Sequence, residues 1–464
     1  YEYLKTGQAF PVSKISTNSA SVQVTNLGVA TGDRMVTAKI ELVYPRKFNF
    51  GNAVNFPFEL PANTAGNYLE IAGFNFSGTA PVLYDLTNGR RYTVDISTPS
   101  LIKVVLQPSS VNRQLILVSE AASNIKAVTA LEQRDFIDYA STQNQGDFMI
   151  ITNAVLTGAS GPGDPVEDYR QYRSSAAGGS FSAKTYLIDQ LVDQYAYGIK
   201  MHPLAIRNFV KAARDKNALK PRFVLLIGKG MVYTSFKSNE SSVNISRLQL
   251  VPTFGYPASD NLLTAQGNSS IPLTPIGRLS VIAKDEITAY LEKLKAYELE
   301  LKTSSSVIAD ASWKKNVIHV TGASDEGTTV LLVNALNGHR KIIEDTAYAG
   351  NVHTFTKTSA DAVEQVNATQ IGNLFGQGVG LLTYFGHSSA TTLEFNLDNP
   401  QAYDNAGKYP IFIVMGCNAG NFFLYNEARL VIKETISESY ILAPHRGAVA
   451  FLASTHLGVV HYLD

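Results

Sequence analysis

Cysteine is almost absent from this chain, and that scarcity sets the first limit on its chemistry. The 464 residues contain a single cysteine, Cys417, so no disulfide can form within the chain. A lone thiol is either a buried core residue or a reactive group that has been kept for its chemistry. We interpret the low count as typical of an exported protein that keeps one thiol for a purpose.

Net charge and long apolar runs are missing as well. Lys+Arg and Asp+Glu both number 39, so the formal charge is zero. Nucleic-acid binding and polybasic membrane anchoring need a strong positive field, and we exclude both as the main function. No apolar run approaches the roughly 18 residues that span a bilayer. The chain begins at Tyr1 without a charged leader, which we interpret as a mature form.

The first 145 residues lack helical periodicity and are predicted to form an all-β module. Short alternating segments recur there, for example at 68–72 and 101–106, with Gly, Pro and Asn between them. The Asn88-Gly89 pair lies between two β-rich segments, which is a strong hairpin signal. These features predict a sandwich-like domain over residues 1–145.

Strands and helices alternate after about residue 146. Continuous apolar segments predict buried strands at 147–152, 223–227, 276–281, 316–321, 378–385 and 410–415. Amphipathic segments between them predict helices, the last of them over 427–440. Such alternation is typical of mostly parallel sheets that are covered on both faces. A Ser-rich stretch at 303–311 divides this α/β region into two predicted subdomains, 146–311 and 312–464.

Two apolar strands of the last subdomain each end in a residue with reactive chemistry. The first is followed by Gly386, His387 and Ser388, and the second by Gly416 and Cys417. His387 and Cys417 are 30 residues apart, which is about one strand-to-strand crossover. Because the carboxyl ends of parallel strands meet at one edge of a sheet, we expect the imidazole and the thiol to face each other across a cleft.

A thiol beside an imidazole provides a nucleophile and a proton acceptor. We therefore assign Cys417 as the nucleophile and His387 as the base that later protonates the leaving amine. The backbone N–H groups near Cys417 and the one of Ser388 are the expected oxyanion hole. The alternative for each residue is structural: a core cysteine and a hydrogen-bonded surface histidine.

The same residues resemble the signature of gingipain-like cysteine peptidases, which are relatives of the caspases in fold. That signature is an apolar strand, Gly-His-Gly-Ser, and a second apolar strand that ends in Cys. The resemblance extends over residues 147–464 and includes Pro221-Arg-Phe-Val-Leu-Leu-Ile-Gly228, Ser259-Asp260 and Ile276-Gly-Arg278. With a β-rich region in front, the order is most similar to the sortase of the type IX secretion system (PorU-type).

This resemblance implies an exported cysteine endopeptidase at the cell surface, peripheral to the outer membrane of a Gram-negative bacterium. It would cleave C-terminal sorting signals from secreted cargo proteins through a Cys-His acyl-enzyme and transfer the cargo to a lipopolysaccharide amine. Its partners would be that cargo and outer-membrane subunits of the secretion system, with no nucleic acid. No cofactor is required by the resemblance, although structural calcium in polar loops is compatible with it.

The resemblance also implies an acidic residue that orients the histidine. Asp325 and Glu326, after the strand at 316–321, are the candidates, and the alternative is that they cap the following helix. A substrate-binding wall is expected close to the nucleophile, from Asn418, Thr455 and His456. An exposed loop histidine is the alternative reading of His456.

The sequence departs from that family in three places. Ser388 replaces the second Gly of Gly-His-Gly-Ser, and Lys229 replaces an acidic residue after Gly228. The chain also stops at Asp464, before the family's peptidase domain normally ends, so we expect the last subdomain to be truncated. The first two departures favour an alternative function, a catalytically inactive scaffold that binds cargo or secretion partners. A carbohydrate-binding surface protein built on the β-rich module is a third candidate.

Other catalytic signatures are missing. The chain contains no Gly-x-Ser-x-Gly elbow, zinc-protease helix or P-loop. Its eight histidines do not occur at metal-ligand spacing, so no metal site is predicted.

Overall fold

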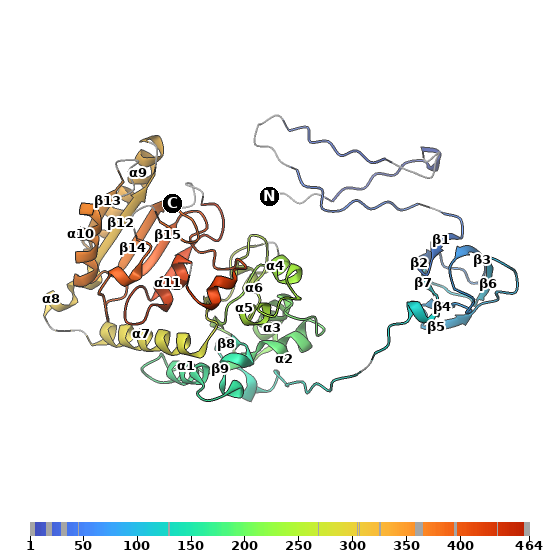
Figure 1. The fold of residues 1–464 in the computed structure, drawn as a ribbon, viewed down its shortest axis with the longest axis horizontal. Coiled ribbons are helices and arrows are strands. Elements are labelled where there is room, and N and C mark those ends of the chain that lie inside the picture. The colour runs from blue at the N-terminus through green and yellow to red at the C-terminus, as the bar shows by residue number, and fades with distance from the viewer. Residues whose placement is uncertain are drawn as a thin grey trace. The chain divides into compact units, whose positions relative to one another are not determined.

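A computed structural model describes most of the chain, over residues 5–14, 21–28, 35–44, 46–128, 130–267, 269–303, 305, 307–323, 326–357, 365–393, 397–433 and 435–458. The chain forms two compact units, Tyr1–Gln133 and Arg134–Asp464 (Figure 1). Among the described residues, no helix is both long and apolar enough to cross a membrane. The three domain ranges expected from the sequence stay a prediction; below, first and second subdomain name the parts of the second unit that are built around its four-stranded and its five-stranded parallel sheet.

The N-terminal unit contains two small sheets that enclose one core. The first has the order β1 (Asn49–Ala53), β3 (Asn67–Phe74), β6 (Leu101–Leu106), and the second β2 (Asn55–Leu60), β7 (Arg113–Val118), β4 (Val82–Asp85), β5 (Arg90–Thr93). All pairs are antiparallel except β1 with β3. Alternate residues such as Ile71 and Leu117 are buried between the sheets. The predicted hairpin joins β4 to β5, with Gly89 at a φ of 62°. The predicted β module is confirmed.

The first sheet of the second unit has the order β11 (Ile276–Leu279), β10 (Phe223–Ile227), β8 (Phe148–Thr152), β9 (Ala183–Leu187) and is wholly parallel. Helices cover both of its faces. Met149 and Ile151 pack with α2 (Ile188–Tyr195) and α3 (Leu204–Lys216). Phe148 and Ile150 point to the other face, where they pack with α1 (Pro165–Ser174) and α7 (Lys284–Lys302). Three short helices lie in the connections: α4 (Tyr233–Ser238), α5 (Ile245–Leu248) and α6 (Asn261–Thr264).

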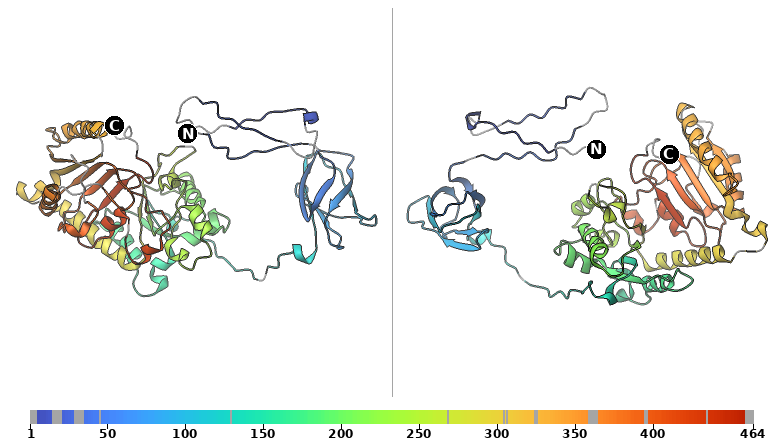
Figure 2. Two further views of the ribbon diagram at one scale, coloured as in Figure 1. Left: turned by 45° about the horizontal axis from the view of Figure 1, so that its top comes forward. Right: turned by 180° about the vertical axis from the view of Figure 1, so that it is seen from behind.

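The second sheet of this unit has five parallel strands, in the order β13 (Asn351–Thr356), β12 (Asn316–Gly322), β14 (Leu381–Gly386), β15 (Ile411–Met415), β16 (Ala450–Ala453). Ile318 and Tyr384 lie in the core with α10 (Gln365–Gln377) and α11 (Ile436–Leu442). Phe385 faces the other way, toward α9 (Glu326–Ile343). Figure 2 shows these strands side by side between their helices.

Two wholly parallel sheets in one unit confirm the predicted α/β architecture. The remaining elements are α8 (Ile308–Ala311) and the short 3-10 helices η1 (Val12–Lys14), η2 (Ala122–Asn124), η3 (Thr142–Asn144), η4 (Ala154–Leu156), η5 (Gly158–Ser160), η6 (Ser312–Lys315), η7 (Pro400–Ala402) and η8 (Glu427–Leu430).

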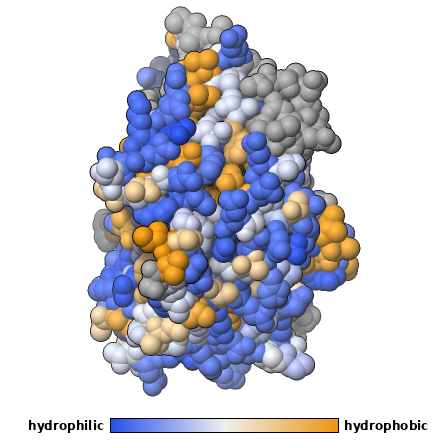
Figure 3. Space-filling view, turned by 90° about the vertical axis from the view of Figure 1, so that its left-hand side faces the viewer, coloured by the Kyte–Doolittle hydropathy of each residue, from blue (hydrophilic) through white to orange (hydrophobic). Residues whose placement is uncertain are grey.

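On the side where α8, α9 and α10 lie in Figure 1, hydrophobic clusters are scattered among hydrophilic side chains (Figure 3).

The helix predicted over 427–440 was wrong as a single element. The structure has η8 at its start and α11 at its end, and residues 431–433 between them are not helical. Arg429 and Glu438, which a single surface helix would hold in solvent, are 4% and 2% exposed. Both charges point into the protein, where they meet partners from the first sheet's subdomain.

Candidate active site

The loops that follow β14 and β15 lie next to each other at the carboxyl edge of the five-stranded sheet. The two strands pair directly, and Phe385 lies in register with Met415. His387 and Cys417 each come two residues after that pair. The structure therefore brings the imidazole-bearing and thiol-bearing loops to the same sheet edge, on neighbouring strands.

The Cys417 side chain is half-buried and touches the loop after β16. The backbone N–H of Gly458 donates a hydrogen bond to Cys417 Sγ at 3.3 Å. Asn418 N–H donates to the His456 carbonyl at 2.7 Å, and Gly420 N–H donates to the Ser454 carbonyl at 2.9 Å. Because an N–H dipole aimed at sulfur stabilises negative charge there, this arrangement suits a reactive thiolate.

Ser388 ties the histidine loop to the cysteine loop. Its hydroxyl donates a hydrogen bond to the Cys417 carbonyl at 2.9 Å. The serine lies so close to Gly416 that a Cβ added to that glycine would be 2.1 Å from Ser388 Oγ. At the position where the resembled Gly-His-Gly-Ser signature has its second glycine, this serine thus fills a space that Gly416 leaves free. His387 itself is exposed, and its carbonyl accepts a hydrogen bond from the Tyr384 hydroxyl.

The predicted acidic residues follow β12, on the other side of β14. Gly322, the last residue of β12, lies in register with Gly386, so this loop belongs to the same sheet edge as His387. Glu326 is the exposed first residue of α9, and within the described residues no hydrogen bond joins it to His387. Asp325 lies outside the described residues, so the choice between the two acids stays open.

The surface expected to bind substrate borders a loop that the sequence did not indicate. The Thr455 hydroxyl donates a hydrogen bond to the Ala258 carbonyl at 2.7 Å. Ala258 belongs to a loop of the first sheet's subdomain, and Tyr256 in that loop is 81% exposed. His456 is exposed next to this contact. The first subdomain therefore supplies part of the surface around the thiol loop, with an aromatic side chain free to meet a ligand.

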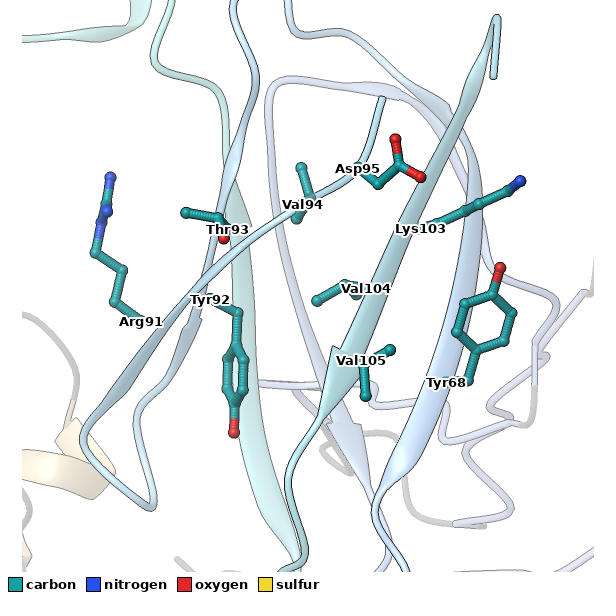
Figure 4. A pocket seen from close by; sticks show the side chains of 9 residues that line it. All are labelled: Tyr68, Arg91, Tyr92, Thr93, Val94, Asp95, Lys103, Val104 and Val105. Atoms are coloured by element: carbon teal, nitrogen blue, oxygen red, sulfur yellow. The ribbon is translucent and has the colours of Figure 1, made fainter. Parts of the chain in front are cut away.

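On the N-terminal unit, the described structure has a groove whose lining residues include no cysteine and no histidine. This groove has a volume of about 550 Å³ and lies between β5 and β6. Figure 4 shows its lining residues: Tyr68, Arg91, Tyr92, Thr93, Val94, Asp95, Lys103, Val104 and Val105. In the part of the chain that the structure describes, no three His, Cys, Asp or Glu side chains are placed to hold a metal ion.

Comparison with known proteins gives distant structural neighbours. The search of curated proteins found no match. The crystal structure of the Arg-specific cysteine proteinase gingipain R has 17% sequence identity and a TM-score of 0.47, covering 68% of this chain and 64% of that one. The complex of Porphyromonas gingivalis RgpB pro- and mature domains has 18% identity and a TM-score of 0.47, covering 67% and 64%. This chain thus aligns with less than two thirds of either neighbour.

Family membership is carried by the sequence. The model of Peptidase family C25 matches residues 141–464, which is more than half of the chain. The matched region contains both parallel sheets and the edge where the thiol and imidazole loops meet. The chain belongs to peptidase family C25, a family of cysteine peptidases.

Proposed function

We propose that this protein is a cysteine endopeptidase in which Cys417 is the nucleophile and His387 the general base and acid. One observation carries the proposal: β14 and β15 are paired neighbours, with the histidine and the cysteine at equivalent positions beyond a register pair. The N–H of Gly458 on the sulfur supports it, since a core cysteine needs no such donor. Membership of the C25 family supplies the reaction class.

The proposed reaction passes through a thioester between Cys417 and the substrate. Cys417 passes its thiol proton to His387, and the sulfur attacks the scissile carbonyl carbon to form an S–C bond. The carbonyl electrons move onto oxygen, where backbone N–H groups near Cys417 and Ser388 stabilise them. The C–N bond then breaks as His387 delivers the proton to the leaving amine. Water or an amine then attacks the thioester carbonyl carbon and gives a proton to His387, the C–S bond breaks, and His387 returns the proton to the Cys417 sulfur.

Labelling of the thiol tests this assignment directly, because Cys417 is the one cysteine in the chain. At pH 6, iodoacetamide should label Cys417 in the native protein faster than it labels the thiol of glutathione. The reason is that the thiolate is the reactive form, and a neighbouring imidazole favours it. His387→Ala should slow that labelling by about tenfold or more. Labelling at the glutathione rate in both proteins would instead support the inactive scaffold, in which the peptidase fold only binds cargo.

The substrate part of the proposal is finer and rests on the motif order together with the β-rich unit in front of the peptidase region. The protein would act at the cell surface, peripheral to the outer membrane, on cargo that carries a C-terminal sorting signal. It would work beside secretion-system subunits and transfer cargo to a lipopolysaccharide amine. Calcium in polar loops is compatible with this function.

A cargo protein with its C-terminal signal domain is the probe for that finer part. Incubation with the full chain should release the signal, and Cys417→Ser should not. Mass spectrometry of the new C terminus separates a free carboxylate, made by hydrolysis, from an amide formed with an added amino sugar. Fast thiol labelling without cargo cleavage would refute the sorting role and leave the cysteine peptidase intact.

A further inference from the structure

Four charged side chains form a buried cluster between the two subdomains of the second unit. Lys229 follows β10, Glu286 lies in α7, Arg429 in η8 and Glu438 in α11. They are only 2%, 8%, 4% and 2% exposed, respectively. We call these residues the inter-subdomain ion cluster. A buried charge is costly unless it is paired, so the contacts within this cluster decide what it does.

Glu438 is the centre of the cluster. Lys229 Nζ donates to Glu438 Oε1 at 3.0 Å, and Arg429 Nε donates to the same oxygen at 3.1 Å. Arg429 also donates to Glu286 Oε2 at 3.0 Å. Burial lowers the pKa of the Lys229 ammonium, and the Glu438 carboxylate opposes that effect. Two buried cations and two buried anions thus pair with one another, and the partly exposed Lys433 adds a further ion pair to Glu286 at 3.5 Å.

Lys229 also makes a contact outside the cluster, to the chain that leaves the nucleophile. Its ammonium donates to the Phe422 carbonyl at 2.6 Å, and Phe422 lies five residues after Cys417. The next carbonyl, of Phe423, accepts a hydrogen bond from Val232 N–H at 3.0 Å. The residue at the position of the family's acidic group thus holds a carbonyl that an acid could not hold, because a carboxylate cannot donate.

We propose that Lys229 is a positioning residue: it fixes the Phe422 carbonyl and thereby holds the Cys417 loop where the thiol meets His387. This inference rests on the proposed function of Cys417. The chain from Cys417 to Phe423 is then held on one side by the loop after β16 and on the other by Lys229 and Val232. A nucleophile misplaced by about 1 Å loses up to about a hundredfold in rate, so the hydrogen bond from Lys229 to the Phe422 carbonyl affects catalysis.

The test compares the rate of iodoacetamide labelling, its pH profile and the thermal midpoint in three variants. Lys229→Met removes the ammonium but keeps the length of the side chain, and should slow labelling about tenfold and lower the midpoint. Adding Glu438→Gln to that variant removes the unbalanced charge, so the midpoint should recover while labelling stays slow. Only a positioning role predicts that separation.

Lys293→Met is the matched control. Lys293 is 1% exposed and donates to the carbonyls of Tyr440 and Ile441, at 3.1 and 2.9 Å, away from the cysteine loop. Its loss should lower the midpoint without slowing the labelling of Cys417. Fast labelling in Lys229→Met would overturn the positioning role alone. Labelling of the unmodified protein at the glutathione rate would overturn the proposed function itself.

Discussion

His319 should make the stability of the second unit depend on pH between 4 and 6.5. It lies in the middle of β12, in register with Thr354 of β13 and Thr383 of β14, and is 0% exposed. Neither of its ring nitrogens has a hydrogen-bond partner among the described residues. Burial lowers the pKa of His319 from 6.5 to about 4. Nearby charges contribute less: His339 and Arg340 of α9 lower this pKa further, and Glu344, the residue after α9, raises it.

The sign follows from which state binds the proton. Between pH 4 and 6.5 the unfolded chain protonates His319 and the folded chain does not, so acid favours unfolding. The stability is complete above pH 6.5 and is lost as the pH falls toward 4. At roughly 1.4 kcal/mol per unit of pKa, the full loss is about 3 kcal/mol, and about 2 kcal/mol of it occurs between pH 7 and 5.

Trp313 provides a local assay for this effect. It is the single tryptophan of the chain, 3% exposed, in η6 immediately before β12. Urea unfolding followed by tryptophan fluorescence should show the loss of about 2 kcal/mol from pH 7 to 5 in the unmodified protein. His319→Leu should reduce that loss, because it removes the titrating group and two unpaired buried nitrogens.

His445→Asn is the control for that assay. His445 is an exposed histidine at a φ of 56°, a conformation that Asn tolerates, so this variant replaces a surface histidine without changing the core. It should keep the full pH dependence. If His319→Leu keeps it as well, then burial of the imidazole does not govern the acid stability and the reasoning from its environment is refuted.

Two further predictions concern the active-site loops. Gly416→Ala should lower the iodoacetamide labelling rate of Cys417 to that of glutathione, since the added Cβ would lie 2.1 Å from Ser388 Oγ. Adding Ser388→Gly to this variant should restore part of the rate, and no recovery would contradict this account. Thr455→Val removes the 2.7 Å hydrogen bond to the Ala258 carbonyl; it should raise KM for cargo several-fold and also slow the labelling of Cys417, because the same bond holds the loop beside the thiol. Tyr256→Ala should act in the same direction, and unchanged KM in both variants would exclude this loop from substrate binding.

The neighbouring strands that carry the candidate site could be predicted from the sequence because their signals are local. Continuous apolar runs identify β14 and β15, and the parallel arrangement brings His387 and Cys417 to one edge. The inter-subdomain ion cluster could not be predicted in this way. Lys229 and Glu438 are 209 residues apart, and nothing near either residue in the sequence indicates that the other will neutralise it. A lone charge in a sequence is therefore read as exposed, although these two are buried.

The first subdomain contacts both of the loops that flank Cys417. The five-stranded sheet alone carries the thiol and the imidazole, but neither of the loops that flank Cys417 is held by that sheet alone. The Phe422 carbonyl is bound by Lys229, and Thr455 is bound by the Ala258 carbonyl, both from the first subdomain. Contacts between the two subdomains thus fix the chain on both sides of Cys417 at once. A change at their interface should therefore alter thiol reactivity before it alters the secondary structure of either sheet, because the strand ladders lie within each subdomain and the loop contacts lie between them.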